Sequence, residues 1–387
     1  MRKKILYPLL ENAFNRQDIE IGKKILDSRK ITMGKITENF EKQFAKYVKA
    51  KYAVMVNSGS SANLLSVFVS KFLKKINLGD EAIIPAVCWS TSLWPLVQAG
   101  MKPVFVDVDL DTYNASLNQI ISKITKKTKI IMILHVLGTC GNIDKIKKIA
   151  KDKKIILIED TCEALGAKFK KKNLGTFGDF GTYSFYYSHQ ITSGEGGMIV
   201  TNKKKNYELL KIMRAHGWDR DIKKNKKKIF NFINMGFNLR PLEISAGIAS
   251  NQLKRLNKFS TVRNTNRNKI LNALKRNEKW NNQFIFVKPK KYTEPSWFGL
   301  PMLLANKYVK QREQLILKLN RNGIETRPII SGNFLNQKAT KVFNLNHQKI
   351  QFKNSDLVEK SGFFIGLHTK PINKEILKKI VNTLLDV

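Results

Sequence analysis

The chain has 387 residues, of which 42% are hydrophobic and 26% are charged. This composition is typical of a globular protein, and the length allows one large domain and a smaller one. The sequence has no run of roughly 18 apolar residues, so we expect no transmembrane helix. Its basic opening lacks the long apolar core of a signal peptide, so we expect that segment to belong to the fold and the protein to be cytoplasmic.

The charge is strongly unbalanced, with 70 Lys and Arg against 30 Asp and Glu and a formal net charge of +40. A balance of this kind can indicate a nucleic-acid or membrane partner. The lysines, however, are spread along the whole chain, and no helix-turn-helix, zinc finger or basic motif interleaved with aromatics accompanies them. We therefore expect solvated lysine faces, no nucleic-acid or membrane partner, and a general attraction for anionic ligands.

The cysteines exclude another set of functions. Cys88, Cys140 and Cys162 are too few and too widely spaced for a disulfide framework. They also form no closely spaced pair of the kind that binds zinc or an iron–sulfur cluster. We expect three free thiols and no metal site.

In chain order, short β-rich runs alternate with helical patterns in the first half of the sequence. Helix-like stretches cover residues 61–76 and 142–154, and strand-like runs cover 52–56, 82–85, 103–108, 130–136, 155–160 and 197–201. Such alternation predicts an α/β layered domain with a largely parallel sheet. The unbroken apolar runs indicate strands that are covered on both faces.

The second half begins with a helical pattern over residues 241–276, which predicts one long helix that leaves the first domain. Strand-like and helix-like patterns follow at 285–287, 299–304 and 308–323. We expect a large cofactor-binding α/β domain at 1–250 and a small C-terminal α+β domain at 251–387, with the long helix linking them.

The segment 57–63, NSGSSAN, lies between a predicted strand and a predicted helix. Its small residues let the backbone approach an anion, and a helix N-terminus supplies free N–H groups and a positive dipole end. The same Ser and Gly residues also suit an ordinary helix cap, so this segment alone is a weak indication of a site.

Asp160 comes at the end of a hydrophobic strand, in IEDTCEALGA at 158–167. Ligands of α/β sheets collect at this edge, and a carboxylate there suits a protonated pyridine nitrogen. A helix-capping aspartate is the alternative, and the one we prefer for Asp160 taken by itself.

The segment SFYYSHQITSGEGG at 184–197 places His189 among aromatic residues, and its glycines suit a tight turn into the following strand. Ser184 is able to bind a phosphate oxygen. A lone histidine beside aromatics is usually structural. The three segments nevertheless come in the order and spacing of a single cofactor site.

This last segment resembles the one that carries the cofactor-binding lysine in pyridoxal-phosphate aminotransferases, with His189 at the lysine's position. Further similar segments are PAVCWSTSLWPL, IEDTCEALGA, RAHGWDR, FNLRPLE, PSWFG and RPIISGNF. Over nearly its whole length the chain resembles the DegT/DnrJ/EryC1/StrS family of sugar aminotransferase-like enzymes. The resemblance implies the α/β fold-type I of pyridoxal-phosphate-dependent transferases, with a large α/β domain and a small C-terminal α+β domain.

The resemblance also assigns roles to individual residues. Those that match cofactor contacts are Gly59 and Ser60 (phosphate turn), Ser184 (phosphate), Trp89 (ring stacking), Asp160 (pyridine nitrogen), its acidic neighbour Glu163, and Asn238. His189 matches the catalytic base. Those that match the substrate region are His216, Arg220, Phe230, Arg240 and Glu325. Asn238 and Arg240 match residues that reach the neighbouring subunit's site, which implies a homodimer with a shared active site.

Histidine in place of lysine changes the expected chemistry. An imidazole forms no stable Schiff base, but its ordinary pKa of ~6.5, against ~10.4 for lysine, lets it move protons near neutral pH. We therefore expect pyridoxal 5'-phosphate or pyridoxamine 5'-phosphate to bind non-covalently.

The histidine-bearing branch of the family implies that the C3 hydroxyl is removed from a nucleotide-linked 4-keto-6-deoxyhexose, with GDP-4-keto-6-deoxymannose as the expected substrate. The products are a 3,6-dideoxy-4-keto sugar and ammonia, and L-glutamate regenerates pyridoxamine phosphate. A related branch that uses an iron–sulfur cluster is disfavoured, because no cysteine follows Cys162.

Three alternatives remain. The first is a nucleotide-sugar aminotransferase that tolerates histidine, and the second is a cofactor-binding or regulatory protein without catalysis. The third is a basic nucleic-acid-binding protein. The sequence leaves open which nucleotide and which hexose stereochemistry the protein recognises.

Overall fold

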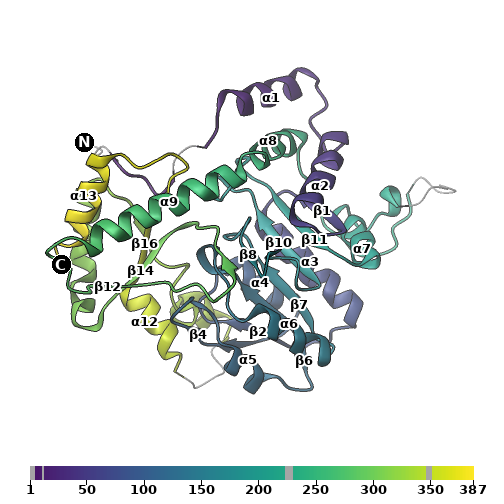
Figure 1. The fold of residues 1–387 in the computed structure, drawn as a ribbon. Coiled ribbons are helices and arrows are strands. Elements are labelled where there is room, and N and C mark those ends of the chain that lie inside the picture. The colour runs from purple at the N-terminus through teal and green to yellow at the C-terminus, as the bar shows by residue number, and fades with distance from the viewer. Residues whose placement is uncertain (1–4, 11–12, 223–229, 346–350) are drawn as a thin grey trace.

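A seven-stranded sheet forms the centre of the larger part of the molecule (Figure 1). The structure is a computed structural model that describes residues 5–10, 13–222, 230–345 and 351–387. In spatial order the strands are β1 (Tyr52–Val56), β11 (Gly197–Thr201), β10 (Phe180–Ser184), β7 (Ile156–Asp160), β6 (Thr128–Leu134), β2 (Glu81–Pro85) and β3 (Lys102–Val106). The strands from β10 to β3 pair in parallel, and β11 runs antiparallel to both β1 and β10. The prediction of a largely parallel α/β sheet is confirmed.

Both faces of this sheet are buried, as the continuous apolar runs predicted. Neighbouring residues of one strand enter different cores: Ile130 of β6 packs into the cluster that includes Leu65 and Leu93, whereas Ile131 packs with Ile143. The helices on the first face are α3 (Gly59–Lys74), α4 (Ser90–Gln98) and α7 (Lys204–Arg214), and those on the second are α2 (Lys35–Val48), α5 (Leu117–Lys123) and α6 (Ile143–Asp152).

A second, four-stranded antiparallel sheet belongs to the C-terminal part. Its strands, in spatial order, are β12 (Phe284–Phe286), β14 (Gly299–Leu304), β16 (Gly362–Gly366) and β15 (Thr326–Arg327). Its helices are α10 (Arg312–Arg321), α11 (Lys338–Val342), α12 (Lys353–Ser361) and α13 (Lys374–Leu384). The expected small α+β domain is therefore present, and one contiguous buried cluster joins its core to the first face of the large sheet.

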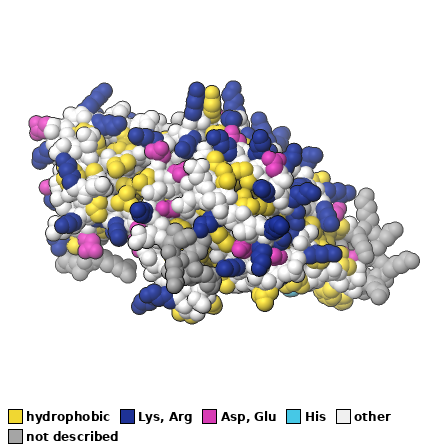
Figure 2. Space-filling view, turned by 90° about the horizontal axis from the view of Figure 1, so that it is seen from below, with side chains coloured by type: hydrophobic (Ala, Val, Ile, Leu, Met, Phe, Trp, Pro, Cys, Tyr) yellow, Lys and Arg dark blue, Asp and Glu magenta, His cyan; other side chains and the backbone are white. Residues whose placement is uncertain are grey.

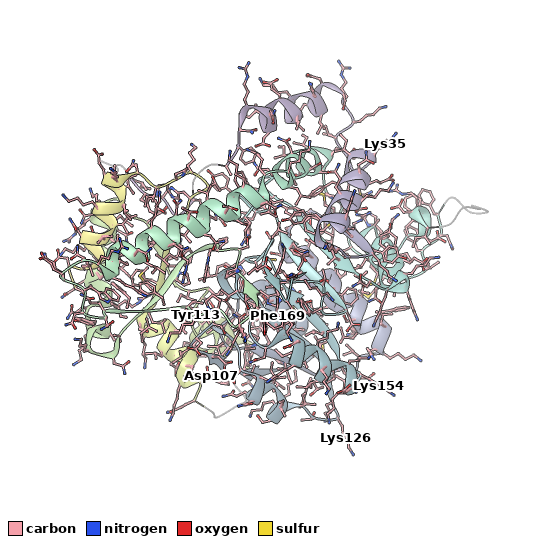
Figure 3. All side chains as sticks on the ribbon, in the orientation of Figure 1. Lys35, Asp107, Tyr113, Lys126, Lys154 and Phe169 are labelled. Carbon is pink, nitrogen blue, oxygen red and sulfur yellow. The ribbon has the colours of Figure 1, made fainter. Side chains whose placement is uncertain are left out.

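Short elements complete the described chain. They are β4 (Val108–Asp109), β5 (Asn114–Ala115), β8 (Lys168–Phe169), β9 (Lys172–Asn173), β13 (Thr293–Glu294) and the 3-10 helices at Val136–Gly138, Asp219–Asp221, Asn306–Gln311 and Phe334–Asn336. Asp107, labelled in Figure 3, joins the two parts because its Oδ1 accepts from the backbone N and the hydroxyl of Ser355 at 2.8 and 2.6 Å.

The segment expected to be one helix over 241–276 is two helices, α8 (Glu243–Leu253) and α9 (Leu256–Lys275). The chain turns at 254–255, where the Arg255 guanidinium binds Asp18 of α1 (Arg16–Asp27). Leu253 and Leu256 flank the turn and are buried in the same cluster. The prediction of an uninterrupted helix is wrong at this turn, although α9 does extend from the large part towards the small sheet (Figure 1). The domain boundary at residue 250 stays a prediction.

The segment at residues 5–10 packs on the small sheet although the prediction grouped it with 1–250. Tyr7 pairs with Ile324, its hydroxyl donates to the Gly366 carbonyl at 3.0 Å, and its ring stacks on His368. As expected, these residues belong to the fold.

Basic side chains are scattered rather than gathered on the face seen in Figure 2, where apolar and acidic groups lie between them. Lys126 and Lys154 lie at the lower edge of the molecule in Figure 3, near the amino ends of β6 and β7. Within the described ranges, no helix is long and apolar enough to cross a membrane.

Candidate active site

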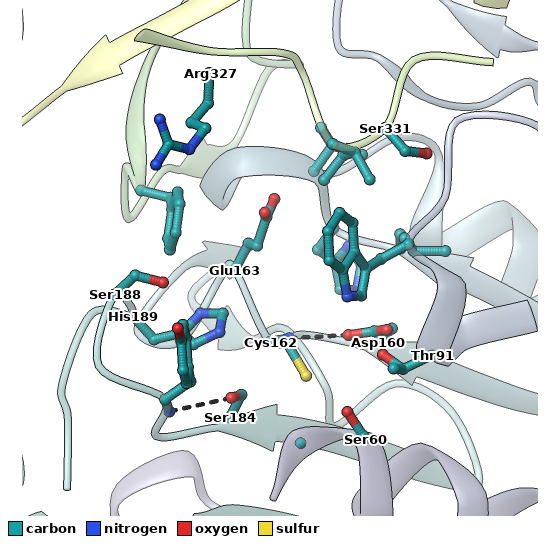
Figure 4. Close-up of a pocket in the computed structure, with 18 of the residues that line it drawn as sticks. Ser60, Thr91, Asp160, Cys162, Glu163, Ser184, Ser188, His189, Arg327 and Ser331 are labelled. Atoms are coloured by element: carbon teal, nitrogen blue, oxygen red, sulfur yellow. Dashed lines mark hydrogen bonds between the residues drawn. The ribbon is translucent and has the colours of Figure 1, made fainter. Parts of the chain in front are cut away.

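A cavity of about 790 Å³ lies at the carboxyl ends of β1, β6, β7 and β10, the edge at which α/β sheets bind ligands (Figure 4). The large sheet forms its floor, and residues of the small sheet and of the loop after β15 form its opposite wall. Seven predicted residues line this one cavity: Gly59, Ser60, Trp89, Asp160, Glu163, Ser184 and His189. The structure thus brings together the three motifs that were predicted separately.

One end of the cavity is an anion-binding turn at the start of α3. Ser58 caps the helix by accepting from the backbone N of Ser61 at 3.1 Å, so the first turn of the helix opens towards the cavity. A Cβ on Gly59 would lie 2.5 Å from the Cβ of Ser184, which explains why only glycine suits this position. Ser184 Oγ accepts from the Tyr186 backbone N at 3.2 Å, so its own hydrogen stays free to donate. These groups suit a phosphate.

Asp160 lies at the floor of the cavity and is 7% exposed. Its Oδ2 accepts from Asn63 Nδ2 at 2.8 Å and from Ser92 Oγ at 2.7 Å, and its Oδ1 accepts from the Cys162 backbone N at 3.1 Å. The surrounding groups therefore hydrogen-bond the carboxylate form, which is the form that accepts from a protonated ring nitrogen.

His189 is partly buried beside Phe298 and Tyr186, with ring centroids 5.3 and 6.1 Å away. Its Nδ1 is shielded from solvent and meets no hydrogen-bond partner in the described part of the chain. Burial lowers the pKa of His189 to about 4, although the Asp160 charge and the Cys162 backbone act in the opposite direction. The imidazole is therefore neutral at pH 7 and able to accept a proton.

Glu163 points into the same cavity (Figure 4). Its Oε2 accepts from the Leu137 backbone N at 3.0 Å. Burial raises the pKa of this carboxyl to about 8; the Leu137 N–H opposes the shift and the Asp160 charge adds to it. At neutral pH Glu163 therefore carries a proton that it is able to donate.

Arg327 of β15 is the most informative residue that the sequence reasoning missed. Of the described residues, it is the single Arg or Lys that lines the cavity, and its guanidinium lies 3.5 Å from Glu325. RPIISGNF contributed to the resemblance, but no role was given to its arginine. The sequence offered one indication of this role, because Arg327 directly precedes Pro328 at the end of a strand.

The wall opposite the large sheet was also missed. Its loop is attached to the large domain by two hydrogen bonds, from Ser331 Oγ to the Cys88 carbonyl at 2.6 Å and from the Phe334 backbone N to the Ala86 carbonyl at 2.9 Å. Other lining residues without a predicted role are Thr91, Tyr186, Ser188, Phe298, Ile330, Gln337 and Phe364. Thr91, Tyr186 and Ser188 lie in segments that the resemblance had singled out. The others belong to the opposite wall, which no single motif identifies because it forms only when the two domains pack together.

Six predicted residues lie elsewhere in the chain: Asn238, His216, Arg220, Phe230, Arg240 and Glu325. Glu325 Oε2 accepts from the Leu9 backbone N at 3.0 Å, so it fastens the N-terminal segment. Arg240 Nε donates to Asn238 Oδ1 at 3.0 Å. Their predicted roles stay predictions.

Phe230 belongs to what we call the aromatic surface, formed by Trp218, Phe230 and Phe232, and Arg220 contacts this surface. The Arg220 guanidinium lies 4.5 Å from the ring centroid of Trp218, and Phe230 packs on the same indole at 5.2 Å. Phe230 and Phe232 are 65% and 60% exposed. In the single chain this surface is separate from the cavity.

The cavity combines an anion-binding turn, a carboxylate held by three hydrogen bonds and a neutral imidazole. This combination of groups fits pyridoxal phosphate. Gly59 and Ser184 provide the close approach that a phosphate needs, and Asp160 provides an acceptor for the ring nitrogen. The mixed α/β sheet and this cavity define an enzyme of the pyridoxal-phosphate-dependent, fold-type I aminotransferase class.

A family comparison makes the assignment more specific. The pattern of the DegT/DnrJ/EryC1/StrS aminotransferase family matches residues 13–385, and the chain belongs to this family.

Relatives of known name cover almost the whole chain. GDP-4-keto-6-deoxy-D-mannose 3-dehydratase of Escherichia coli O55:H7 is 40% identical over 96% of this chain and 98% of its own. A solved E. coli structure of that name, with bound hydrated PLP, superposes with a TM-score of 0.91 at 38% identity and covers 99% of this chain and 100% of its own. Another, with a trapped PLP-glutamate geminal diamine, has a TM-score of 0.89 at 38% identity and covers 98% and 100%.

Proposed function

We propose that this protein is a pyridoxamine-phosphate-dependent 3-dehydratase of a GDP-linked 4-keto-6-deoxyhexose, with GDP-4-keto-6-deoxy-D-mannose as substrate. The observation that carries the proposal is a neutral histidine, His189, in a cavity otherwise furnished for pyridoxal phosphate. The described lining of that cavity contains no lysine. The named relatives at 38–40% identity support the substrate.

Different cofactor-binding residues contact the phosphate, the ring nitrogen and the ring face of the cofactor. Gly59, Ser60 and Ser184 bind the phosphate, Asp160 accepts from the ring nitrogen, and Trp89, at the N-terminal end of α4, stacks on the ring. When bound, pyridoxamine phosphate supplies an amine for the C4 ketone of the sugar and an electron sink for the bond that breaks at C3.

His189 moves the proton. As a neutral imidazole it accepts a proton from the carbon next to the amine, and as an imidazolium it returns that proton to the departing C3 hydroxyl. The protonated Glu163 is a second acid of the same cavity. Phe298, Phe364 and Ile330 line the cavity opposite the large sheet with apolar surface.

The overall reaction balances with glutamate as the reductant. Each removed oxygen corresponds to one 2-oxoglutarate and one ammonia, and the sugar product is a 3,6-dideoxy-4-keto sugar. Arg327, which lines the cavity, binds a carboxylate of glutamate through charge-assisted hydrogen bonds.

We further propose a cytoplasmic homodimer with a shared active site. The aromatic surface, Arg240 and Asn238 then reach the partner's cavity and complete its substrate side. The exposure of Phe230 and Phe232 supports this proposal, because a contiguous exposed patch of large aromatic side chains is typical of a surface that binds a partner.

The proposal is tested by mixing the purified protein with pyridoxamine phosphate, glutamate and GDP-4-keto-6-deoxymannose, and by measuring free ammonia and the mass of the sugar. Ammonia together with a sugar that is one oxygen poorer supports the dehydratase. An amino sugar without ammonia contradicts it and favours the nucleotide-sugar aminotransferase. No reaction with this substrate, but turnover with a CDP-, UDP- or dTDP-linked one, rejects the GDP assignment alone.

A further inference from the structure

A buried chain of hydrogen bonds runs from β10 through α3 to Asp160. Thr182 Oγ1 donates to Asn63 Oδ1 at 2.6 Å, and Asn63 Nδ2 donates to Asp160 Oδ2 at 2.8 Å. Asn63 and Thr182 are both fully buried. Unlike Asp160, neither of them lines the cavity, and the Asn63 amide reaches the cavity lining through its hydrogen bond to Asp160.

Asp160 fixes the direction of the Asn63 amide, and Thr182 satisfies the amide oxygen in that direction, although its hydroxyl also lies 3.3 Å from the Glu159 carbonyl. With the amide reversed, its oxygen would face Asp160 Oδ2 across 2.8 Å, and two acceptors would meet without a proton between them. In the observed direction, the Thr182 hydroxyl satisfies the amide oxygen and the amide hydrogens face the carboxylate. The pair therefore presents Asp160 Oδ2 with a hydrogen-bond donor rather than an acceptor.

The periodicities of the two elements explain why these residues occur at these positions. Asn63 follows Gly59 by four residues, so one face of α3 carries both the phosphate turn and the amide. Thr182 precedes Ser184 by two residues, so one face of β10 carries both the phosphate serine and the threonine, and Thr182 is in register with Asp160 of β7. The same two elements thus set the phosphate end and the ring-nitrogen end of the cavity.

We propose that Asn63 and Thr182 are a positioning pair that holds Asp160 as the acceptor for the protonated ring nitrogen of the cofactor. This inference rests on the proposed function, because it concerns the same site. Ser92 and the Cys162 backbone N anchor the carboxylate, whereas the amide is the donor whose own oxygen is bound by a further residue.

The first test uses Asn63→Leu, which keeps the size of the side chain and removes the donor. Binding of pyridoxamine phosphate to cofactor-free protein is measured by equilibrium dialysis, and protonation of the cofactor's ring nitrogen is followed by ¹⁵N NMR of ¹⁵N-labelled cofactor. We expect the dissociation constant to rise about tenfold or more, since a hydrogen bond to a charged group is lost. The nitrogen signal moves towards the unprotonated position at a lower pH than in the wild type.

Thr182→Val tests whether the hydrogen bond from Thr182 to Asn63 affects Asp160. It also serves as the second variant if Asn63→Leu does not fold. It removes only the hydroxyl, so we expect a smaller change in the same two measurements, and Thr182→Ser restores wild-type values. The double variant behaves like Asn63→Leu alone, because Thr182 acts through Asn63. The matched control is Thr201→Val, which removes a buried hydroxyl bound to the Asp179 carbonyl at the other end of the large sheet.

Three outcomes would each contradict the proposal that Asn63 and Thr182 position Asp160. They are wild-type affinity and ring protonation in folded Asn63→Leu, additive effects in the double variant, and an equal effect of Thr201→Val. If the wild type releases ammonia from its substrate while any of these holds, only the pair is rejected. If the wild type binds no pyridoxamine phosphate, the proposed function is rejected and the pair with it.

Discussion

The cofactor cavity and the aromatic surface are built in opposite ways. In the cavity, the carboxylate of Asp160 has three donors and is almost completely buried. On the aromatic surface, Phe230 and Phe232 leave more than half of their area in water, and their rings pack against each other and against Trp218, which also contacts Arg220. The carboxylate of Asp160 is fully partnered within a single chain, whereas the aromatic surface leaves apolar area exposed, as the proposed dimer would require of a surface that a partner covers.

The predicted site residues fall into two groups, those that line the cavity and those that lie outside it. Residues of a complete site reveal themselves by converging on one cavity, and seven predicted residues do so. The six predicted residues that lie outside the cavity would serve a neighbouring subunit only if the proposed dimer forms. The comparison is therefore best tested by variants that affect one region and spare the other.

The largest effect is expected for His189→Ala. Ammonia release falls by about 10³-fold, within the range of general acid–base catalysis, while pyridoxamine phosphate still binds because the phosphate turn and Asp160 are intact. Steady-state ammonia release and equilibrium dialysis measure the two properties on one sample. Tyr187→Phe, an exposed neighbour outside the cavity, serves as the control.

His189→Lys sharpens this test, since it also loses dehydration but permits covalent attachment of pyridoxal phosphate. Mass spectrometry after borohydride reduction detects that bond. Undiminished dehydration in either variant would remove His189 from the mechanism.

The second prediction concerns the boundary between the two regions. Arg240→Ala lowers activity about ten- to a hundredfold, because a charge-assisted hydrogen bond to the substrate is lost. When Arg240→Ala and His189→Ala chains are co-expressed with different tags, activity returns to about a quarter of the wild-type level. Random pairing makes half of the dimers mixed, and each mixed dimer has one intact site of two.

The matched control combines His189→Ala with Asp160→Ala, two residues of the same cavity. No activity returns in this mixture, because each mixed dimer carries a defect in both sites. If the Arg240→Ala mixture behaves like this control, Arg240 does not serve the partner's cavity and the contrast between the regions is lost.

The cavity floor was predictable because its chemistry follows directly from local sequence. The motifs at 57–63 and at Asp160 follow predicted strands with apolar runs, and β1 and β11 have the predicted bounds of 52–56 and 197–201, whereas β10 (Phe180–Ser184), which carries Ser184, was not predicted. The order and spacing of the three segments, together with the family resemblance, led us to expect Gly59, Asp160 and Ser184 in one site, and the parallel strands do bring their carboxyl ends to one edge.

The opposite wall and the helix turn at 254–255 depend on contacts between distant segments. Arg327 enters the cavity because the loop after β15 is fastened to the Cys88 carbonyl. The break between α8 and α9 depends on an ion pair with Asp18, 237 residues away in sequence. Helical periodicity contains no information on either contact, so the pattern over 241–276 indicated a single helix.

The third and smallest effect concerns Glu163 and tests whether its carboxyl group is protonated in the folded protein at neutral pH. Burial raises the pKa of this carboxyl to about 8 from its ordinary value of 4.5. The folded protein thus holds a proton that the unfolded chain has released, so this group's stabilising contribution is complete below about pH 4.5 and is lost as pH rises through about 8. Glu163→Gln keeps an oxygen to accept from the Leu137 N–H but has no charge to bury.

We therefore expect the melting temperature of cofactor-free Glu163→Gln to exceed that of the wild type by a margin that grows from pH 5.5 to pH 8.5, reaching a few °C. Differential scanning calorimetry at both pH values measures it. Glu195→Gln, which removes an exposed carboxylate of the same cavity, controls for the change in net charge. A margin that stays constant with pH would mean that Glu163 is ionised in the folded protein. Glu163 would then have no proton to donate, and His189 would be left as the acid available to the leaving hydroxyl.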